Sequence, residues 1–295
     1  MRRRDPRPIR GLFAPGDARR LAAVRIGLCV ALAVRLSRGI YVELAEQPSE
    51  LFRPLSFMRL LPGMPSEGLV LALQLIGIAA AVLAAVGLRP QLTLPAAWVC
   101  GVFLNGMATS LGKVAHNDVL LLLAMVPLLV VPTGDVWSLD AVRKGRSASA
   151  PSVRYGWPVR TAAIVVAGAY FFTGLAKVFF SGPAWFVSDN LRFALYVSSD
   201  AQSVPNPVGL LVADRPWLAH ALAAGVLAFE LSFPIVLWRP RWAWAFVIGA
   251  AALHLGISAT MHLDYSAWIA TVAVVLIDWP RIADRLAARG RPIPV

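Results

Sequence analysis

The sequence is short of charged residues. Only 15 % of its 295 residues are Asp, Glu, Lys or Arg, whereas hydrophobic residues make up 58 % and the mean hydropathy is +0.66. A soluble domain carries about a quarter charged residues. This shortage excludes an ordinary soluble domain and indicates a protein that has lipid as its solvent.

Cysteine and histidine are also scarce. Cys29 and Cys100 are the two cysteines, both lie in apolar runs, and they form no C-x-x-C pair. The four histidines include no H-E-x-x-H motif. A dithiol redox site is therefore excluded, and we predict no metal centre. Both cysteines are expected to be small buried side chains.

Negative charge is scarce as well, and the formal net charge is +12. The basic residues lie mostly between and outside the apolar runs, so they are better explained by orientation in a bilayer than by a nucleic-acid partner. The first apolar run follows a basic segment, Arg2 to Arg20, without a clear small-residue cleavage site. We therefore expect no cleavable signal peptide.

Long apolar runs are what the sequence has in abundance. We predict an all-α integral membrane protein with a bundle of about eight transmembrane helices, since a spanning helix needs about 20 mostly apolar residues. The weakest run is Leu21–Ile40, because Arg25 and Arg35 bound its apolar core, and it could instead lie in the interface. The other runs are Gly68–Leu88, Leu92–Leu111, Val114–Val131, Thr161–Phe180, Trp217–Trp238, Trp242–Met261 and the short Tyr265–Ile277.

The charges between these runs predict the topology. With eight spans, every basic segment falls on one side, which the positive-inside rule assigns to the cytoplasm. The prediction is a basic cytoplasmic tail over residues 1–20, a transmembrane helical domain over 21–279 and a second basic cytoplasmic tail over 280–295. The Arg- and Ala-rich composition suggests a GC-rich bacterium, hence a multi-pass protein of the bacterial cytoplasmic membrane.

Lys177 is the first candidate functional residue. The chain holds 25 arginines and only three lysines, and a buried lysine can lose its proton where an arginine cannot. Tyr170, Thr173, Gly174 and Lys177 follow helical spacing, so they share one face of the helix over 161–180. The alternative is a lysine that snorkels to the headgroups from a helix end.

Further ionisable residues converge on the same membrane level under this topology. His116, followed by Asn117, opens the fourth span at its outer end, Lys177 lies at the outer end of its span, and His262 ends the seventh. His254 lies two turns deeper on the face of His262. Each histidine could equally be a hydrogen-bonded structural residue.

Glu230 lies deep in the sixth span, nearer the inner side. A structural ion pair with Arg25 or Arg35 is expected there rather than a catalytic carboxylate. Asp118 is expected to cap the start of its helix.

Four segments together resemble the vitamin K-dependent γ-carboxylase-like proteins, also called the horizontally transferred transmembrane (HTTM) domain family. They are Leu21-Ala22-Ala23-Val24-Arg25-Ile26, His116 with its span closed by Trp137-Ser138-Leu139-Asp140-Ala141, Tyr170-Phe171-x-Thr173-Gly174-x-x-Lys177 followed by Trp185, and His254-Leu255-x-Ile257 running to Met261. Together, and in this order, the four segments extend over nearly the whole chain.

The resemblance implies a lysine base. In the carboxylases the lysine of the Tyr-Phe-x-x-Gly-x-x-Lys motif deprotonates vitamin K hydroquinone, and an alkoxide formed with oxygen on the way to the epoxide removes a glutamyl γ-proton so that CO2 adds. Lys177 and His116 would inherit the catalytic roles. Reduced vitamin K or menaquinol, O2 and CO2 would be the co-substrates, at the outer face of the membrane.

The sequence also departs from those enzymes. They carry a large extramembrane substrate domain, and the segments Tyr41–Glu67 and Ser181–Pro216 are too short to supply one. They also have Asn just before the His, where this chain has Ala115. Carboxylation of a protein substrate is therefore in question even if quinol chemistry is kept.

Two other functions fit the same pattern. The chain could be a non-catalytic accessory protein, or one for peptide-toxin maturation, that binds a lipid, quinone or secreted peptide in the same pocket. It could be a quinone-linked redox subunit, although it lacks paired haem-type histidines. A transporter is disfavoured because no pair of Gly/Pro-broken helices repeats between the halves.

Overall fold

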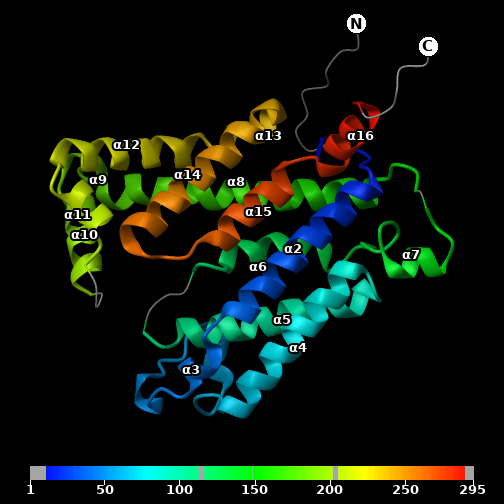
Figure 1. Ribbon diagram of the computed structural model, residues 1–295, viewed down its shortest axis with the longest axis horizontal. Coiled ribbons are helices and arrows are strands. Elements are labelled where there is room, and N and C mark those ends of the chain that lie inside the picture. The colour runs from blue at the N-terminus through cyan, green and yellow to red at the C-terminus, as the bar shows by residue number, and fades with distance from the viewer. Residues whose placement is uncertain (1–10, 113–115, 148, 202–204, 290–295) are drawn as a thin grey trace, which may run out of the picture. The chain divides into compact units, whose positions relative to one another are not determined.

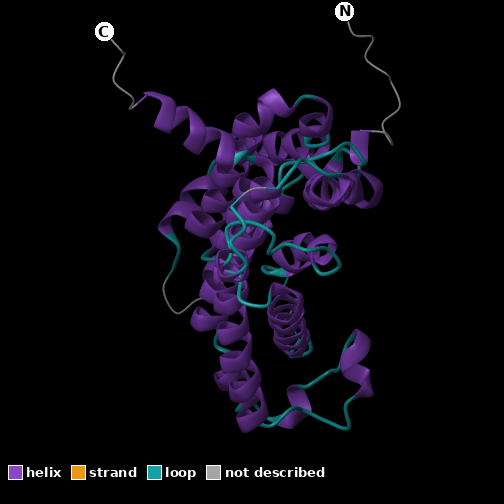
Figure 2. Cartoon of the chain, turned by 90° about the vertical axis from the view of Figure 1, so that its right-hand side faces the viewer, coloured by secondary structure: helices purple, strands orange, loops and turns teal. Residues whose placement is uncertain are grey.

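The computed structural model describes residues 11–112, 116–147, 149–201 and 205–289, which fold almost entirely as helices (Figure 1, Figure 2). These residues form no β-strand, only an isolated bridge between Gly16 and Ser152. The all-helical class predicted from the sequence is therefore confirmed. The chain divides into two compact units, Met1–Ala163 with Ile277–Val295, and Ile164–Leu276.

The first unit contains the long helices α2, α4 and α5 and several shorter ones. Its α-helices are α2 (Ala18–Arg38), α3 (Tyr41–Ala45), α4 (Glu67–Val86), α5 (Pro90–Thr109), α6 (Val119–Met125), α7 (Leu139–Arg143) and α16 (Trp279–Arg289), and its 3-10 helices are η1 (Ser49–Leu51), η2 (Ser56–Leu60) and η3 (Val126–Leu128). The long helix α8 (Val153–Ser181) begins in this unit and ends in the second.

The second unit is built on the end of α8 and on helices that follow it. They are α9 (Ala184–Val187), α10 (Asn190–Asp200), α11 (Pro207–Ala213), α12 (Pro216–Ser232), α13 (Ile235–Trp238), η4 (Pro240–Trp242), α14 (Ala243–Met261) and α15 (Ser266–Leu276). Figure 1 shows α9, α10 and α11 gathered at one end of α12.

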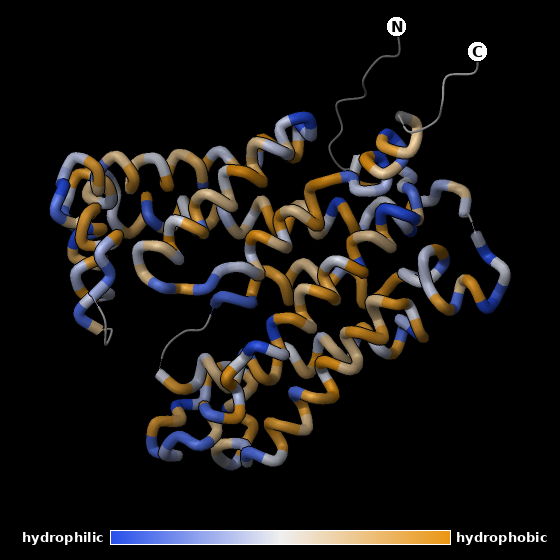
Figure 3. Tube along the Cα trace, in the orientation of Figure 1, coloured by the Kyte–Doolittle hydropathy of each residue, from blue (hydrophilic) through white to orange (hydrophobic). Residues whose placement is uncertain are grey.

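Five helices are long and apolar enough to cross a membrane, and a bent pair, Ser266–Leu276 with Trp279–Ala288, makes a sixth candidate. The five are Glu67–Val86, Pro90–Thr109, Val153–Ser181, Pro216–Trp238 and Pro240–Met261. Figure 3 shows their apolar stretches separated by polar turns. The chain is thus a multi-pass helical membrane protein, for which a lipid bilayer is the natural solvent.

The remaining predicted spans are helical but do not meet the same criteria. Helix α2 has 21 residues, yet it carries several arginines. The run predicted over 114–131 forms the shorter apolar helix Val119–Leu128, whose last residues, Val126–Leu128, are a 3-10 helix that contains Pro127. Val114 and Ala115 lie outside the described residues. The count of eight spans and the cytoplasmic ends remain predictions.

Small residues allow the helices of the first unit to pack closely. Helix α4 buries Gly77, Ala80, Ala81 and Ala84. A Cβ on Gly77 would come within 2.9 Å of both Cys100 Cβ and Leu36 Cδ1. Helices α2, α4 and α5 therefore approach through small side chains, the packing expected where lipid supplies no hydrophobic drive. Cys29 and Cys100 are both free and buried, as predicted.

Arg25 lies at the centre of the first unit and is fully buried. Its Nη1 donates to Thr133 O at 2.5 Å, and its Nη2 donates to Trp137 O at 2.6 Å and to Ala85 O at 3.4 Å. Helix α4 ends at Gly87, which has a φ of +76°. A side chain at Gly87 would meet Ser138. The guanidinium thus joins the end of α4 to the loop before α7.

A second arginine, which is partly buried, joins α2 to α6. Arg35 Nε donates to Asp118 Oδ1 at 2.6 Å, and Nη2 donates to Oδ2 at 3.3 Å. Asp118 occupies the N-cap position of α6, but its side chain caps no helix amide. The predicted capping hydrogen bond from a helix amide to Asp118 is therefore wrong, because the carboxylate binds the Arg35 guanidinium instead.

Candidate functional site

Lys177 and Glu230 form an ion pair between α8 and α12. Lys177 Nζ lies 2.5 Å from Glu230 Oε1 and 2.6 Å from Oε2, so the ammonium bridges both carboxylate oxygens. The side chains are 16 % and 6 % exposed. At an effective dielectric of about 20, opposite charges 4 Å apart attract by about 4 kcal/mol. This pair is closer and is largely shielded from solvent.

A glycine allows the two helices to meet at this point. A Cβ on Gly174 would lie 3.0 Å from Glu230 Cβ and 3.2 Å from Leu231 Cδ2. Gly174 lies one turn before Lys177, on the same face of α8. The small residue brings the backbones together, and the lysine then reaches the carboxylate on the neighbouring helix.

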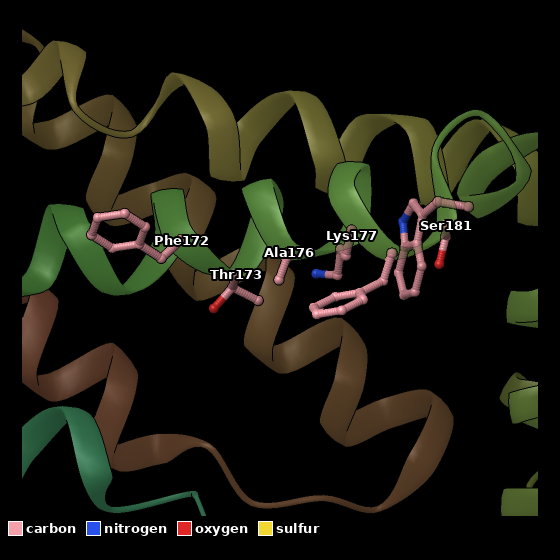
Figure 4. A pocket seen from close by; sticks show the side chains of 7 residues that line it. Phe172, Thr173, Ala176, Lys177 and Ser181 are labelled. Carbon is pink, nitrogen blue, oxygen red and sulfur yellow. The ribbon is translucent and has the colours of Figure 1, made fainter.

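Lys177 also faces a pocket on the surface of the second unit. The pocket has a volume of about 550 Å³ and takes its lining from the last turns of α8 and from α9. Figure 4 shows Thr173, Ala176, Lys177 and Ser181 following one another along α8. The lining residues are Phe172, Thr173, Ala176, Lys177, Phe180, Ser181 and Trp185.

Aromatic rings dominate this pocket. Lys177 Nζ lies 5.0 Å from the centroid of the Trp185 ring, within range of a cation–π contact. Phe172 and Phe180 are 65 % and 83 % exposed. On a helix that is long and apolar enough to span a membrane, such exposed rings are suited to contact acyl chains. Thr173 Oγ1 donates to Ala169 O at 2.7 Å.

Two helical turns before Lys177, a Tyr–His pair joins α8 to α14. Tyr170 Oη and His254 Nε2 are 2.8 Å apart, and both side chains are buried. His254 Nδ1 has no hydrogen-bond partner among the described residues. The Tyr170 ring stacks on Phe233 with centroids 4.1 Å apart and meets Phe229 edge-on at 5.9 Å.

Further rings enclose His254. Tyr265 stacks on it with centroids 5.2 Å apart, and Trp268 lies 5.4 Å away. Phe229 directly precedes Glu230 on α12, and Phe233 is the C-cap residue of that helix, so both rings that contact Tyr170 lie close to the carboxylate in the sequence. The ion pair and the Tyr–His pair therefore share one aromatic core.

This arrangement suits proton transfer with an apolar partner. It offers an amine and a carboxylate in direct contact beside a pocket lined by exposed aromatic rings. The described residues contain no group of three or more His, Cys, Asp or Glu side chains that could hold a metal ion. The chemistry on offer is that of an acid–base pair in an apolar environment.

The other predicted site residues occupy different positions. His116 and Asn117 precede α6 in the first unit, whereas Lys177 belongs to the second, so their convergence stays a prediction. His262 ends α14 with a φ of +53°. Its Nε2 lies 3.4 Å from Asn206 Nδ2, beside the start of α11, and His262 is not among the residues that line the pocket.

The expected partners of Glu230 are wrong. The structure pairs Glu230 with Lys177, whereas Arg25 binds backbone carbonyls and Arg35 binds Asp118. Lys177 and Glu230 are the two opposite charges in the otherwise uncharged stretches of α8 and α12 that pack together. That complementarity was the signal in the sequence that could have identified the pair.

Comparison with known families agrees with this architecture. A family model described as the HTTM domain matches residues 13–279, which include the whole second unit, most of the first and every residue of the candidate site. No curated protein and no solved structure matches the chain. Because the match covers most of the sequence, the chain belongs to the HTTM domain family, a carboxylase-related family of polytopic membrane proteins.

Proposed function

We propose that this protein is a membrane enzyme that removes a proton from a lipid-soluble hydroxyaromatic substrate, a reduced quinone such as reduced vitamin K or menaquinol. The observation that carries the proposal is the Lys177–Glu230 pair beneath an aromatic pocket whose outer rings face lipid. Membership of a carboxylase-related family supports the same chemistry.

The pocket fits a quinol in size and character. A volume of about 550 Å³ lies within the range of small-molecule sites, which is roughly 300–1,000 Å³. Phe172, Phe180 and Trp185 offer ring faces, and the Lys177 amine is the charged group at the pocket wall. A flat ring with a polar hydroxyl and an apolar tail matches these surfaces.

Each residue has a defined role in the proposed reaction. Lys177 accepts the hydroxyl proton and then remains as an ammonium ion beside the oxyanion. Trp185 supplies a ring face to the ammonium, and the phenylalanine rings keep water away. In an apolar site this charge stabilisation is stronger than it is in water. The bound reduced quinone supplies the reducing electrons for chemistry with oxygen.

The overall reaction balances with O2 and CO2 as co-substrates. Quinol and O2 give quinone epoxide and water, and a carbon acid and CO2 give a carboxylate and a proton. We place the site on the outer side of a bacterial cytoplasmic membrane, a placement supported by the distribution of basic residues. The carbon acid is a secreted peptide or a smaller molecule.

The test uses protein purified in lipid nanodiscs and supplied with reduced vitamin K or menaquinol and oxygen. Wild type is expected to form epoxide, detected by mass spectrometry. Lys177→Ala and Lys177→Arg are both expected to lower the rate by about 100-fold or more, since general base catalysis contributes at least that much. Arg keeps the charge but cannot accept a proton.

Two results would contradict the proposal. A folded Lys177→Arg protein with undiminished epoxide formation would exclude Lys177 as the base. Failure of folded wild type to form epoxide would favour the accessory function, in which the same pocket binds a lipid, quinone or peptide without turnover. A quinol-binding titration on the same samples would then separate quinone binding from peptide binding.

A further inference from the structure

The geometry of Lys177 poses a problem for base chemistry. An amine that bridges both oxygens of a buried carboxylate holds a proton, and an ammonium ion cannot accept another. The proposed function therefore requires a group that takes the proton from Lys177. That group must contact Nζ directly and must accept hydrogen bonds.

Glu230 meets both requirements. Its two oxygens lie 2.5 and 2.6 Å from Nζ. Trp185 offers Lys177 a ring face, and Thr173 Oγ1 is used as a donor to Ala169 O. Tyr170 and His254 are bonded to each other. The carboxylate is thus the acceptor that the contacts of Lys177 provide.

We infer that Glu230 is the final proton acceptor of the site and acts through Lys177, which relays the proton. The inference rests on the proposed function. The Lys177 ammonium first gives a proton to the Glu230 carboxylate, which leaves a neutral amine and a neutral carboxylic acid. The amine then takes the proton of the substrate hydroxyl. The result is an ammonium ion, a protonated Glu230 and a substrate oxyanion, with no net change in charge.

Burial favours this sequence of transfers. Moving the proton within the pair replaces two buried charges by two neutral groups, and desolvation favours neutral forms. After the second transfer, the ammonium ion lies against the Trp185 ring and the new oxyanion. A charge pair is therefore present before and after the reaction, and Glu230 keeps the proton.

If Glu230 is not the proton acceptor, its removal is expected to have the opposite effect on base chemistry. If the carboxylate only held Lys177 in its charged form, its removal would leave a neutral amine in an apolar site and would preserve or improve base chemistry. If Glu230 accepts the proton, its removal abolishes base chemistry. Glu230→Gln keeps the size and one acceptor oxygen of the side chain, so it separates the two roles.

The experiment uses the full chain in nanodiscs and 4-methoxy-1-naphthol, a methylated hydroquinone with one ionisable hydroxyl. Wild type is expected to bind the probe and to form bound naphtholate, seen by absorbance. Infrared difference spectra with ¹³C-labelled glutamate are expected to show a protonated carboxyl C=O band on binding. Glu230→Gln is expected to bind the probe but to lose the band and to lower naphtholate by about tenfold or more.

Control variants address folding and assignment. Glu67→Gln alters an exposed carboxylate in the first turn of α4 and should keep both signals. Glu230→Asp retains a carboxylate one methylene shorter, so it should recover part of the naphtholate signal. Because absence of the carboxylic acid band from wild type would by itself overturn the inference, the test stands even if Glu230→Gln does not fold.

The outcomes separate the two claims. Bound naphtholate in wild type without a carboxylic acid band would overturn the role of Glu230 and leave the proposed function in place. Undiminished naphtholate in folded Glu230→Gln would do the same. Failure of wild type to bind the probe would overturn the proposed function and, with it, this inference.

Discussion

Among the described residues, Arg25 hydrogen-bonds backbone carbonyls and no carboxylate, although it is fully buried in a membrane protein. Its planar fork contacts carbonyls from two segments far apart in the sequence, Ala85 at the end of α4 and Thr133 and Trp137 before α7. Carbonyls at a helix C-terminus carry partial negative charge, which partly compensates a cation. Arg25 therefore links the end of α4 to the loop before α7 by hydrogen bonds.

Arg25→Lys should lower the free energy of unfolding by about 2–3 kcal/mol. A lysine keeps the charge but cannot bridge Thr133 O and Trp137 O, so at least one buried carbonyl loses its partner. Thermal unfolding in detergent measures the effect. Arg38→Lys makes the same change at an exposed position of α2 and should alter stability by less than about 0.5 kcal/mol. Equal effects at the two sites would contradict this account of Arg25.

The sequence identified individual ionisable residues better than it identified their partners. Lys177, Glu230, Arg25 and Arg35 all stood out because charge inside an apolar run is costly. The pairing of Glu230 with Lys177 depends on which helices are neighbours, and Gly174 sets that contact. The sequence carries no periodic pattern that tells which helices are neighbours, so the predicted pairing of Glu230 with an arginine was wrong.

Helix α16 is strongly amphipathic. Trp279, Ile282 and Leu286 lie on one face, and Arg281 and Arg285 lie on another. Leu286 is 61 % exposed. Asp284 accepts a hydrogen bond from Arg19 of α2 at 3.0 Å, which attaches the polar face to the protein. The helix overlaps the region predicted from sequence as a basic tail.

We expect α16 to lie in the membrane interface with its apolar face in lipid. A spin label at Leu286→Cys should be reached by lipid-soluble oxygen more readily than by a water-soluble nickel chelate. The native cysteines are buried, so labelling is selective. A label at Ala288→Cys, on the opposite face, should show the reverse preference. Equal exposure to oxygen at both positions would instead place α16 inside the bilayer as part of a span.

The long helices were predictable and the short ones were not. Apolar runs of about 20 residues gave α4, α5 and α14 to within a few residues. The stretch 181–216 was predicted as a connection, yet it folds into α9, α10 and α11. Asn206 explains part of this order, because its Oδ1 caps α11 and its Nδ2 bonds Ala259 O. Hydrogen bonds of this kind stabilise a short helix without giving its sequence a periodic apolar pattern.

The topology of the whole molecule depends on whether Val119–Leu128 crosses the membrane. Its ten residues rise about 15 Å as a helix, against a hydrocarbon core of about 30 Å. Helices α4, α5 and this segment separate the loop after α3 from the loop after α7. Three crossings put the two loops on opposite sides, and two crossings put them on the same side.

Cysteine labelling in intact cells distinguishes these topologies. Ser49→Cys and Ser147→Cys place thiols in the two loops, and both positions are exposed. An impermeant maleimide is expected to label Ser49→Cys from outside and Ser147→Cys only after permeabilisation, as the eight-span prediction requires. The unmodified protein is the background control. Labelling of both positions from the same side would show that Val119–Leu128 does not cross.

The exposed rings of Phe172 and Phe180 have a kinetic consequence under the proposed function. A substrate that enters past them arrives from the bilayer and not from water, so its effective concentration is its mole fraction in the membrane. The apparent KM should then stay constant when expressed per lipid and should rise in bulk units as lipid is added at fixed protein. Surface dilution of this kind would make lipid supply, and not aqueous diffusion, the quantity that sets the turnover rate.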